Sequence, residues 1–231
     1  MPLGFGLSAT LLLFVLWGLV RRGRWRLSRF FLAYVLFGVL SNGLKAFWPA
    51  QFYRGWFYLV AETVYLVLKL GIALEAAWRT FRAFPGARSN ARLIACAVLS
   101  ATALLVLTVP VRGSGYDVYV TTVTELHPRA FNGLIWLMAL TLVLAKWYRV
   151  PVHPFHSGIL IGLVLYSAFL STSLALGGWY GLEALNRWRG AHALAYYLLL
   201  AWYLRLSWRR ESDVTAAHAE IVTTLQPSTS P

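Results

Sequence analysis

Apolar residues fill seven long, nearly continuous stretches of this chain, and polar residues gather in the short segments between them. Each stretch has about the 20 residues that an α-helix needs to cross roughly 30 Å of hydrocarbon. Because backbone groups in lipid must be hydrogen-bonded within their own segment, continuous apolar runs of this length favour helices. The seven stretches are 3–20, 28–48, 55–77, 93–111, a fifth that begins between 118 and 130 and ends near 146, 154–176 and 190–207.

This pattern predicts the fold class, an all-α integral membrane protein with a bundle of seven transmembrane helices. Hydrophobic residues make up 59% of the sequence and charged residues 13%, which is more apolar surface than a soluble domain can bury. We expect the seven-helix transmembrane domain to span residues 1–210. Residues 211–231 are polar, with Ser, Thr and Pro at the end, and are expected to form a flexible cytoplasmic tail.

The distribution of Lys and Arg predicts the orientation of the bundle. Fourteen of the 21 basic residues follow the first, third, fifth and seventh stretches, and four lie in the opposite set of connections. Because cytoplasmic loops carry the excess of basic residues, we expect the N-terminus outside and the C-terminus in the cytoplasm. The larger set is Arg21, Arg22, Arg24, Arg26, Arg29, Arg79, Arg82, Arg88, Arg92, Lys146, Arg149, Arg205, Arg209 and Arg210, and the smaller set is Arg54, Arg112, Arg187 and Arg189.

The net charge of +13 comes from these short basic clusters beside apolar runs, which indicates contacts with anionic lipid and excludes a nucleic-acid-binding function. We therefore predict a multi-pass protein of the bacterial inner (cytoplasmic) membrane that contacts the lipid bilayer, including anionic lipid at its cytoplasmic face. A membrane or cytoplasmic protein partner is a further expectation. The alternative that residues 1–20 form a cleaved signal peptide is disfavoured, because no basic residue precedes the run and Arg21 and Arg22 follow it directly.

Two charged residues lie inside the third stretch. Glu62 and Lys69 are seven residues apart, so they share nearly one helix face, with roughly 10 Å of rise between them. A lone charge at such depth costs about 2.5–3.5 kcal/mol, so both should face the bundle interior. Lys45, near the outer end of the second stretch, is with Asn42 a candidate partner for Glu62. This pattern indicates either a ligand or proton-handling site or a buried polar network that fixes helix packing.

A second polar cluster, Glu125-Leu-His127-Pro128-Arg129, lies where the fifth helix begins. Either Pro128 lies in the first helical turn and the cluster caps the helix at the outer surface, or Pro128 kinks a helix that starts nearer residue 118. The first alternative is favoured. His127 is then expected to be a hydrogen-bonded imidazole at the interface rather than a metal ligand.

Milder polar residues occur at a similar depth in the last two stretches, namely Ser167, Ser171 and Thr172, then His192 and Tyr196 one turn apart. Small hydroxyl residues in membrane helices usually serve packing. Their coincidence in depth with the charged residues nevertheless predicts one outward-facing polar cavity. The candidate site residues are Lys45, Glu62, Lys69, Glu125, His127, Arg129 and His192.

Two expectations concern the basic side of the bundle. Glu75, near the cytoplasmic end of the third stretch, is predicted to pair with Arg79 one turn later. The segment 78–92 contains Pro85-Gly86 and four arginines, and it is predicted to be a basic loop.

Motifs for catalysis are missing from the sequence. It contains no HExxH, no GxSxG, no paired Asp of an intramembrane protease and no phosphate loop, so we predict no catalytic or metal site and no particular cofactor. Rhodopsins and G-protein-coupled receptors share the predicted topology. However, the stretch 190–207 has neither a lysine to hold retinal nor an Asn-Pro-x-x-Tyr motif, and topology alone assigns no family.

Three functions are compatible with these features of the sequence. The first is a sensory or ligand-binding module that passes a signal to a cytoplasmic partner. The second is a structural or assembly subunit of a larger membrane complex. The third is a small transporter or permease subunit with Glu62 and Lys69 on the translocation path.

Overall fold

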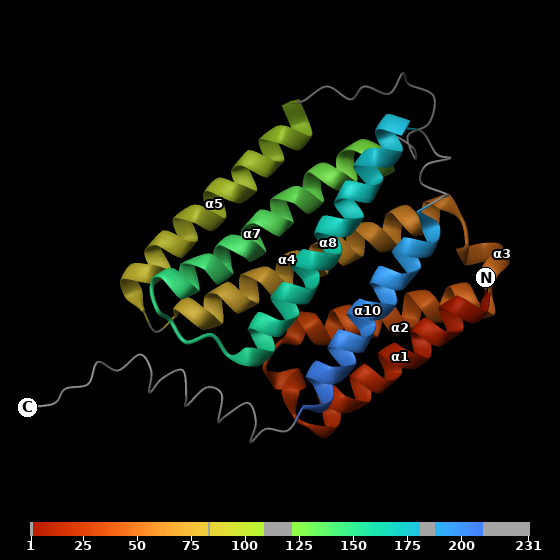
Figure 1. Cartoon of the computed structure of the whole chain (residues 1–231), viewed down its shortest axis with the longest axis horizontal. Coiled ribbons are helices and arrows are strands. Elements are labelled where there is room, and N and C mark those ends of the chain that lie inside the picture. Colours follow the sequence, from red (N-terminus) through yellow and green to blue (C-terminus); the bar gives the residue numbers. More distant parts are fainter. Residues whose placement is uncertain (1, 83, 109–121, 181–187, 210–231) are drawn as a thin grey trace, which may run out of the picture.

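The computed structural model describes residues 2–82, 84–108, 122–180 and 188–209, and all the regular structure in these ranges is helical (Figure 1). The predicted tail at 211–231 lies outside the described residues. So does the segment 109–121, which includes the earliest predicted start of the fifth helix. The long helices are α1 (Pro2–Arg21), α2 (Arg29–Phe47), α4 (Gly55–Phe81), α5 (Pro85–Thr108), α7 (His127–Trp147), α8 (Pro154–Tyr180) and α10 (Arg189–Trp208). The short elements are η1 (Arg24–Arg26), α3 (Pro49–Phe52) and the π-helical segment η2 (Thr122–Leu126).

Six of the long helices, all except α10, are long and apolar enough to cross a membrane, which is the pattern of a multi-pass membrane protein. Helix α10 has 20 residues, but His192, Arg205 and several Tyr and Trp side chains make it less apolar. It is nevertheless part of the bundle. The Tyr197 hydroxyl donates a hydrogen bond to the Gly4 carbonyl of α1 (3.1 Å), and the Trp202 indole donates one to the Gly158 carbonyl of α8 (2.8 Å).

The helices pack so that α1 contacts α2 and α10, α4 contacts α2 and α7, and α8 contacts α7 and α10 (Figure 1). Helix α5 lies on the outside of this group, mainly against α7. Gly133 of α7 permits that close approach, because a Cβ atom there would collide with Thr102 of α5. At the centre, the Phe31 ring makes edge contacts with Tyr203 (centroids 5.0 Å apart) and Phe155 (5.9 Å).

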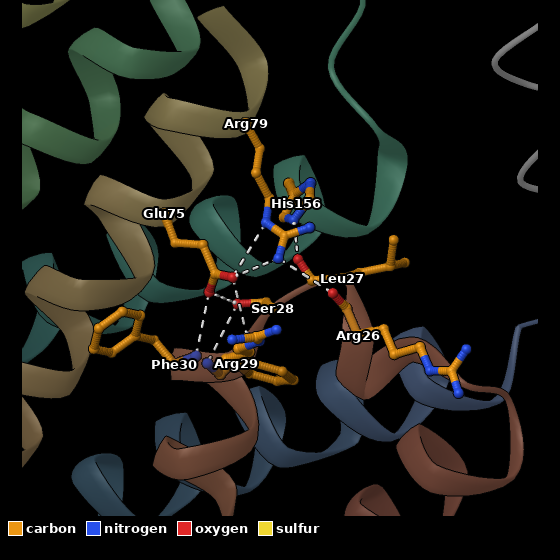
Figure 2. Close-up of polar contacts among 9 residues, drawn as sticks. Arg26, Leu27, Ser28, Arg29, Phe30, Glu75, Arg79 and His156 are labelled. Atoms are coloured by element: carbon orange, nitrogen blue, oxygen red, sulfur yellow. Dashed lines mark hydrogen bonds and ion pairs between the residues drawn. The ribbon is translucent and has the colours of Figure 1, made fainter. Parts of the chain in front are cut away.

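A hydrogen-bonded junction at the basic end of the bundle joins α4 to the start of α2 (Figure 2). The Glu75 carboxylate accepts hydrogen bonds from the Ser28 hydroxyl (2.9 Å) and from the amides of Arg29 and Phe30 (both 3.2 Å). Negative charge at a helix N-terminus is stabilising because it meets unpaired N–H groups and the positive end of the helix dipole. The predicted ion pair with Arg79 is confirmed at 2.9 Å, and the capping of α2 is a second role that the sequence did not indicate.

Arg24 makes the complementary contact at the end of α10. It is 4% exposed, and its guanidinium donates hydrogen bonds to the carbonyls of Leu206 and Arg209 (2.6 Å for the latter). A cation is favourable at a helix C-terminus for the same electrostatic reason that an anion is favourable at the N-terminus. The connection between α1 and α2, together with the first turn of α2, therefore joins α2, α4 and α10 at the basic end of the bundle.

The prediction of a basic loop at 78–92 is wrong. Helix α4 continues through Phe81 and α5 begins at Pro85, so only a short turn connects them. Proline is well tolerated in the first turn of a helix, where its missing N–H would have had no partner.

At the fifth helix, Pro128 lies in the first turn of α7, but the favoured cap is not found: the π-helical segment η2 runs directly into α7, and Leu126 is in the αR conformation with no side-chain cap. His127, expected at the interface, is buried.

Candidate functional site

A polar cavity of about 160 Å³ lies between α2, α4, α8 and α10. It is built from side chains that all four helices direct inward, and we refer to it as the tyrosine cavity. Its lining residues are Tyr34, Asn42 and Lys45 from α2, Glu62, Tyr65 and Lys69 from α4, Tyr166 from α8 and Tyr196 from α10.

Helix α4 supplies two of the three charged residues in the described lining of the tyrosine cavity. Lys69 is 2% exposed, and its ammonium group lies 4.6 Å from the Phe131 ring centroid and 5.7 Å from that of Tyr166. Both distances are within the range of cation–π attraction, which helps to stabilise a buried cation. Glu62 is half-buried, and neither side chain has a hydrogen bond or ion pair with another residue in the described ranges. Their polar atoms are therefore available to the cavity.

Lys45 brings the third charge from α2. Its side chain is half-buried, and its ammonium group lies 5.6 Å from the ring centroids of both Phe5 and Phe57. With Lys45, Glu62 and Lys69 ionised, the described lining has a formal charge of +1. The cavity is thus electropositive.

Hydroxyl and amide groups complete the lining. The Tyr65 hydroxyl is 2.7 Å from Ser41 Oγ, and Asn42 Nδ2 donates to the Tyr196 hydroxyl (3.3 Å) and to the Gly38 carbonyl (2.9 Å). These bonds fix the phenol rings while each hydroxyl keeps the capacity for a further hydrogen bond. In the described lining, ammonium and phenol donors outnumber the one carboxylate, which suits the binding of a small anion.

The structure brings Lys45, Glu62 and Lys69 together and places the other four candidates elsewhere. Glu125 and Arg129 form an ion pair at 3.2 Å near the start of α7. His127 is 8% exposed and packs against the ring of Phe131, which the Lys69 ammonium also approaches; the Nδ1 of His127 has no hydrogen-bond partner within the described residues.

His192 also lies apart from the cavity. Its ring packs against Phe169 of α8, with centroids 5.5 Å apart, and its buried Nε2 has no hydrogen-bond partner among the described residues. Ser171 has a packing role, since its hydroxyl donates to Asn132 Oδ1 of α7 (2.8 Å). In the described part of the chain, no three His, Cys, Asp or Glu side chains come together as a metal site requires.

Five lining residues were not among the seven candidates: Asn42 and Tyr196 were noted in the sequence only as neighbouring polar residues, and Tyr34, Tyr65 and Tyr166 were not singled out at all. A signal for the last three was present. Tyrosine in membrane proteins is enriched at the two interfaces, but these three lie well inside apolar stretches. A phenol at that depth needs a polar neighbour, which points to a cavity or to a hydrogen-bonded partner.

Comparison with known proteins adds no candidate. No protein-family model matches this chain, and neither curated proteins nor solved structures show a significant match. The tyrosine cavity and its charges are therefore the basis on which a function can be proposed.

Proposed function

We propose that this protein is a sensory or ligand-binding membrane module whose ligand is a small anion held in the tyrosine cavity. The observation that carries the proposal is that Lys45 and Lys69 face one cavity in which Glu62 is the single carboxylate among the described lining residues. Desolvated charges of this kind inside a membrane bundle usually mark a binding site or an ion pathway. A bound anion would neutralise the cavity and draw α2, α4, α8 and α10 together, and a membrane or cytoplasmic partner would receive the resulting signal.

The proposal includes seven crossings, with the N-terminus outside and the C-terminus in the cytoplasm. Its support is that α10 packs alongside α1 and α8, and that the connections rich in arginine meet at one end of the bundle. Exposed arginines at this end, such as Arg29, Arg82 and Arg149, would contact anionic lipid of the bacterial inner membrane. On this orientation the tyrosine cavity lies nearer the outer face.

Labelling of introduced cysteines tests the orientation. In a Cys96→Ala background, Gln51→Cys between α2 and α4 should react with a membrane-impermeant maleimide in intact cells. Arg82→Cys, between α4 and α5, should react only after the membrane is permeabilised, because the two exposed positions lie at opposite ends of α4. Labelling of Arg82→Cys in intact cells, with Gln51→Cys protected, would reverse the proposed orientation.

Anion binding can be measured as thermal stabilisation of the purified protein in lipid nanodiscs. Short carboxylates such as butyrate should raise the melting temperature, because a ligand at about 100 times its Kd stabilises the native state by about 2.7 kcal/mol. In Lys69→Gln and in Lys45→Gln, the same rise in melting temperature should require at least ten times more butyrate. Lys146→Gln, the same change at an exposed site at the far end of α7, is the matched control and should bind normally. Equal stabilisation of all four proteins would rule out the tyrosine cavity as the anion site.

A further inference from the structure

An apolar groove of about 450 Å³ lies next to the tyrosine cavity, between α8 and α10. Its walls include Leu165, Tyr166 and Phe169 from α8 and Ala195, Leu198 and Trp202 from α10. Leu165 and Leu198 are 68% and 62% exposed, so the groove opens on the surface that faces lipid in a membrane-spanning bundle. The Trp202 indole N–H already donates to the Gly158 carbonyl, which leaves the groove with few free polar groups.

Tyr166 belongs to both the groove and the cavity. Its ring packs against Tyr196, with centroids 6.0 Å apart, and the Lys69 ammonium lies 5.7 Å from the same ring. Tyr166 therefore lies where an electropositive polar space and an apolar space open to lipid adjoin. A ligand that occupies both spaces would have to displace this side chain.

We infer that the ligand is a long-chain fatty acid whose carboxylate occupies the tyrosine cavity and whose acyl chain lies in the groove between α8 and α10. This inference rests on the proposed function and names the class of its ligand. The head carries one negative charge, which matches the formal +1 of the described lining. The tail is purely apolar, as the groove is.

The dimensions of the two spaces favour a single-chain carboxylate over a phospholipid. The cavity volume of about 160 Å³ suits a carboxylate with a few waters, whereas a glycerophosphate head is larger and carries two chains. Along α8 the groove runs from Ile161 to Phe169, about 12 Å at the rise of an α-helix, so it takes the first part of an acyl chain. The rest of the chain would remain among the lipid tails.

Photolabelling in nanodiscs tests this inference on the wild-type chain. The probe is a palmitate analogue with a diazirine in the middle of its chain, and labelled residues are mapped by mass spectrometry. We expect labels to concentrate on the groove residues of α8 and α10. Unlabelled palmitate should compete at least tenfold better than methyl palmitate, which has the same chain but no charge.

Two tryptophan variants provide a matched pair. Ala195→Trp fills the groove and should reduce labelling at least tenfold. Ala193→Trp adds the same ring to an exposed position of α10 outside the groove and should leave labelling unchanged. Labels spread evenly over exposed helices such as α5, or equal competition by the methyl ester, would overturn the inference.

Failure of this inference is distinguishable from failure of the proposed function. If butyrate stabilises the protein through Lys69 but palmitate does not label the groove, the cavity binds small anions and the fatty-acid assignment is wrong. If neither stabilisation by butyrate nor labelling by the palmitate probe changes in Lys69→Gln, both proposals are wrong.

Discussion

Replacing Glu75 with alanine should lower the free energy of unfolding by about 2–4 kcal/mol, although the residue does not line the tyrosine cavity. Its carboxylate accepts hydrogen bonds from the Ser28 hydroxyl and from two backbone amides in the first turn of α2. Removing an acceptor costs about 1–3 kcal/mol for a buried donor such as the Ser28 hydroxyl, and less for the amides of the exposed residues Arg29 and Phe30, which water can reach. The Glu75 side chain is 11% exposed, so water relieves only part of the cost.

Unfolding in mixed micelles with increasing SDS measures this effect, and two further variants separate its causes. Glu75→Gln keeps an acceptor oxygen and should lose about half as much stability as the alanine variant. Arg79→Gln removes the i,i+4 ion pair but leaves the α2 cap, and a pair with one partner 35% exposed contributes only about 0–1 kcal/mol. If Arg79→Gln costs as much as Glu75→Ala, the ion pair, and not the cap, stabilises this end of the bundle.

The helices were largely predictable because lipid imposes a simple rule on sequence. Long apolar runs must be helical, and their ends follow from arginine clusters and from caps such as Ser28, whose hydroxyl accepts a bond from the Phe31 amide. The rule fails where helices extend beyond the apolar run. Residues 85–92 are polar but helical, since Pro85 starts a helix readily and nothing later in the segment ends it. The polar composition of this segment indicated a loop, but Pro85 favours the start of a helix and the segment is helical.

The cavity was predictable only in part. Glu62 and Lys69 could be placed inside the bundle from the cost of exposing a charge to lipid. Rotation and depth of the neighbouring helices could not be derived in the same way, because they depend on side-chain packing across the bundle. His192 and Tyr196 illustrate the difference. They lie one turn apart on α10, yet only Tyr196 reaches the cavity, while His192 packs on Phe169.

Replacing Glu62 with glutamine distinguishes a ligand site from a structural polar network. If the tyrosine cavity binds an anion, the variant should bind butyrate about ten times more tightly, because the formal charge of the described lining rises from +1 to +2. At an effective dielectric constant of about 20, a unit charge even about 10 Å away contributes about 1.7 kcal/mol, slightly more than a factor of ten in Kd. Stability without ligand should fall by at most about 2 kcal/mol, since Glu62 attracts Lys45 and Lys69 across the cavity but has no ion pair with any described residue.

The structural alternative predicts the opposite pattern for Glu62→Gln. If Glu62 mainly balances the buried Lys69, its loss leaves an uncompensated cation and can cost about 3–5 kcal/mol. A second substitution, Lys69→Met, should then restore stability, and a double-mutant cycle measures the coupling between the two residues. The cycle would use unfolding in mixed micelles, with Lys146→Met as the matched control for removing a lysine. Strong destabilisation with rescue by Lys69→Met, and no gain in anion affinity, would identify a subunit whose charges hold the bundle together. A loss of stability of at most about 2 kcal/mol, with tighter anion binding, would instead identify Glu62 as the residue that limits the affinity of the tyrosine cavity for its ligand.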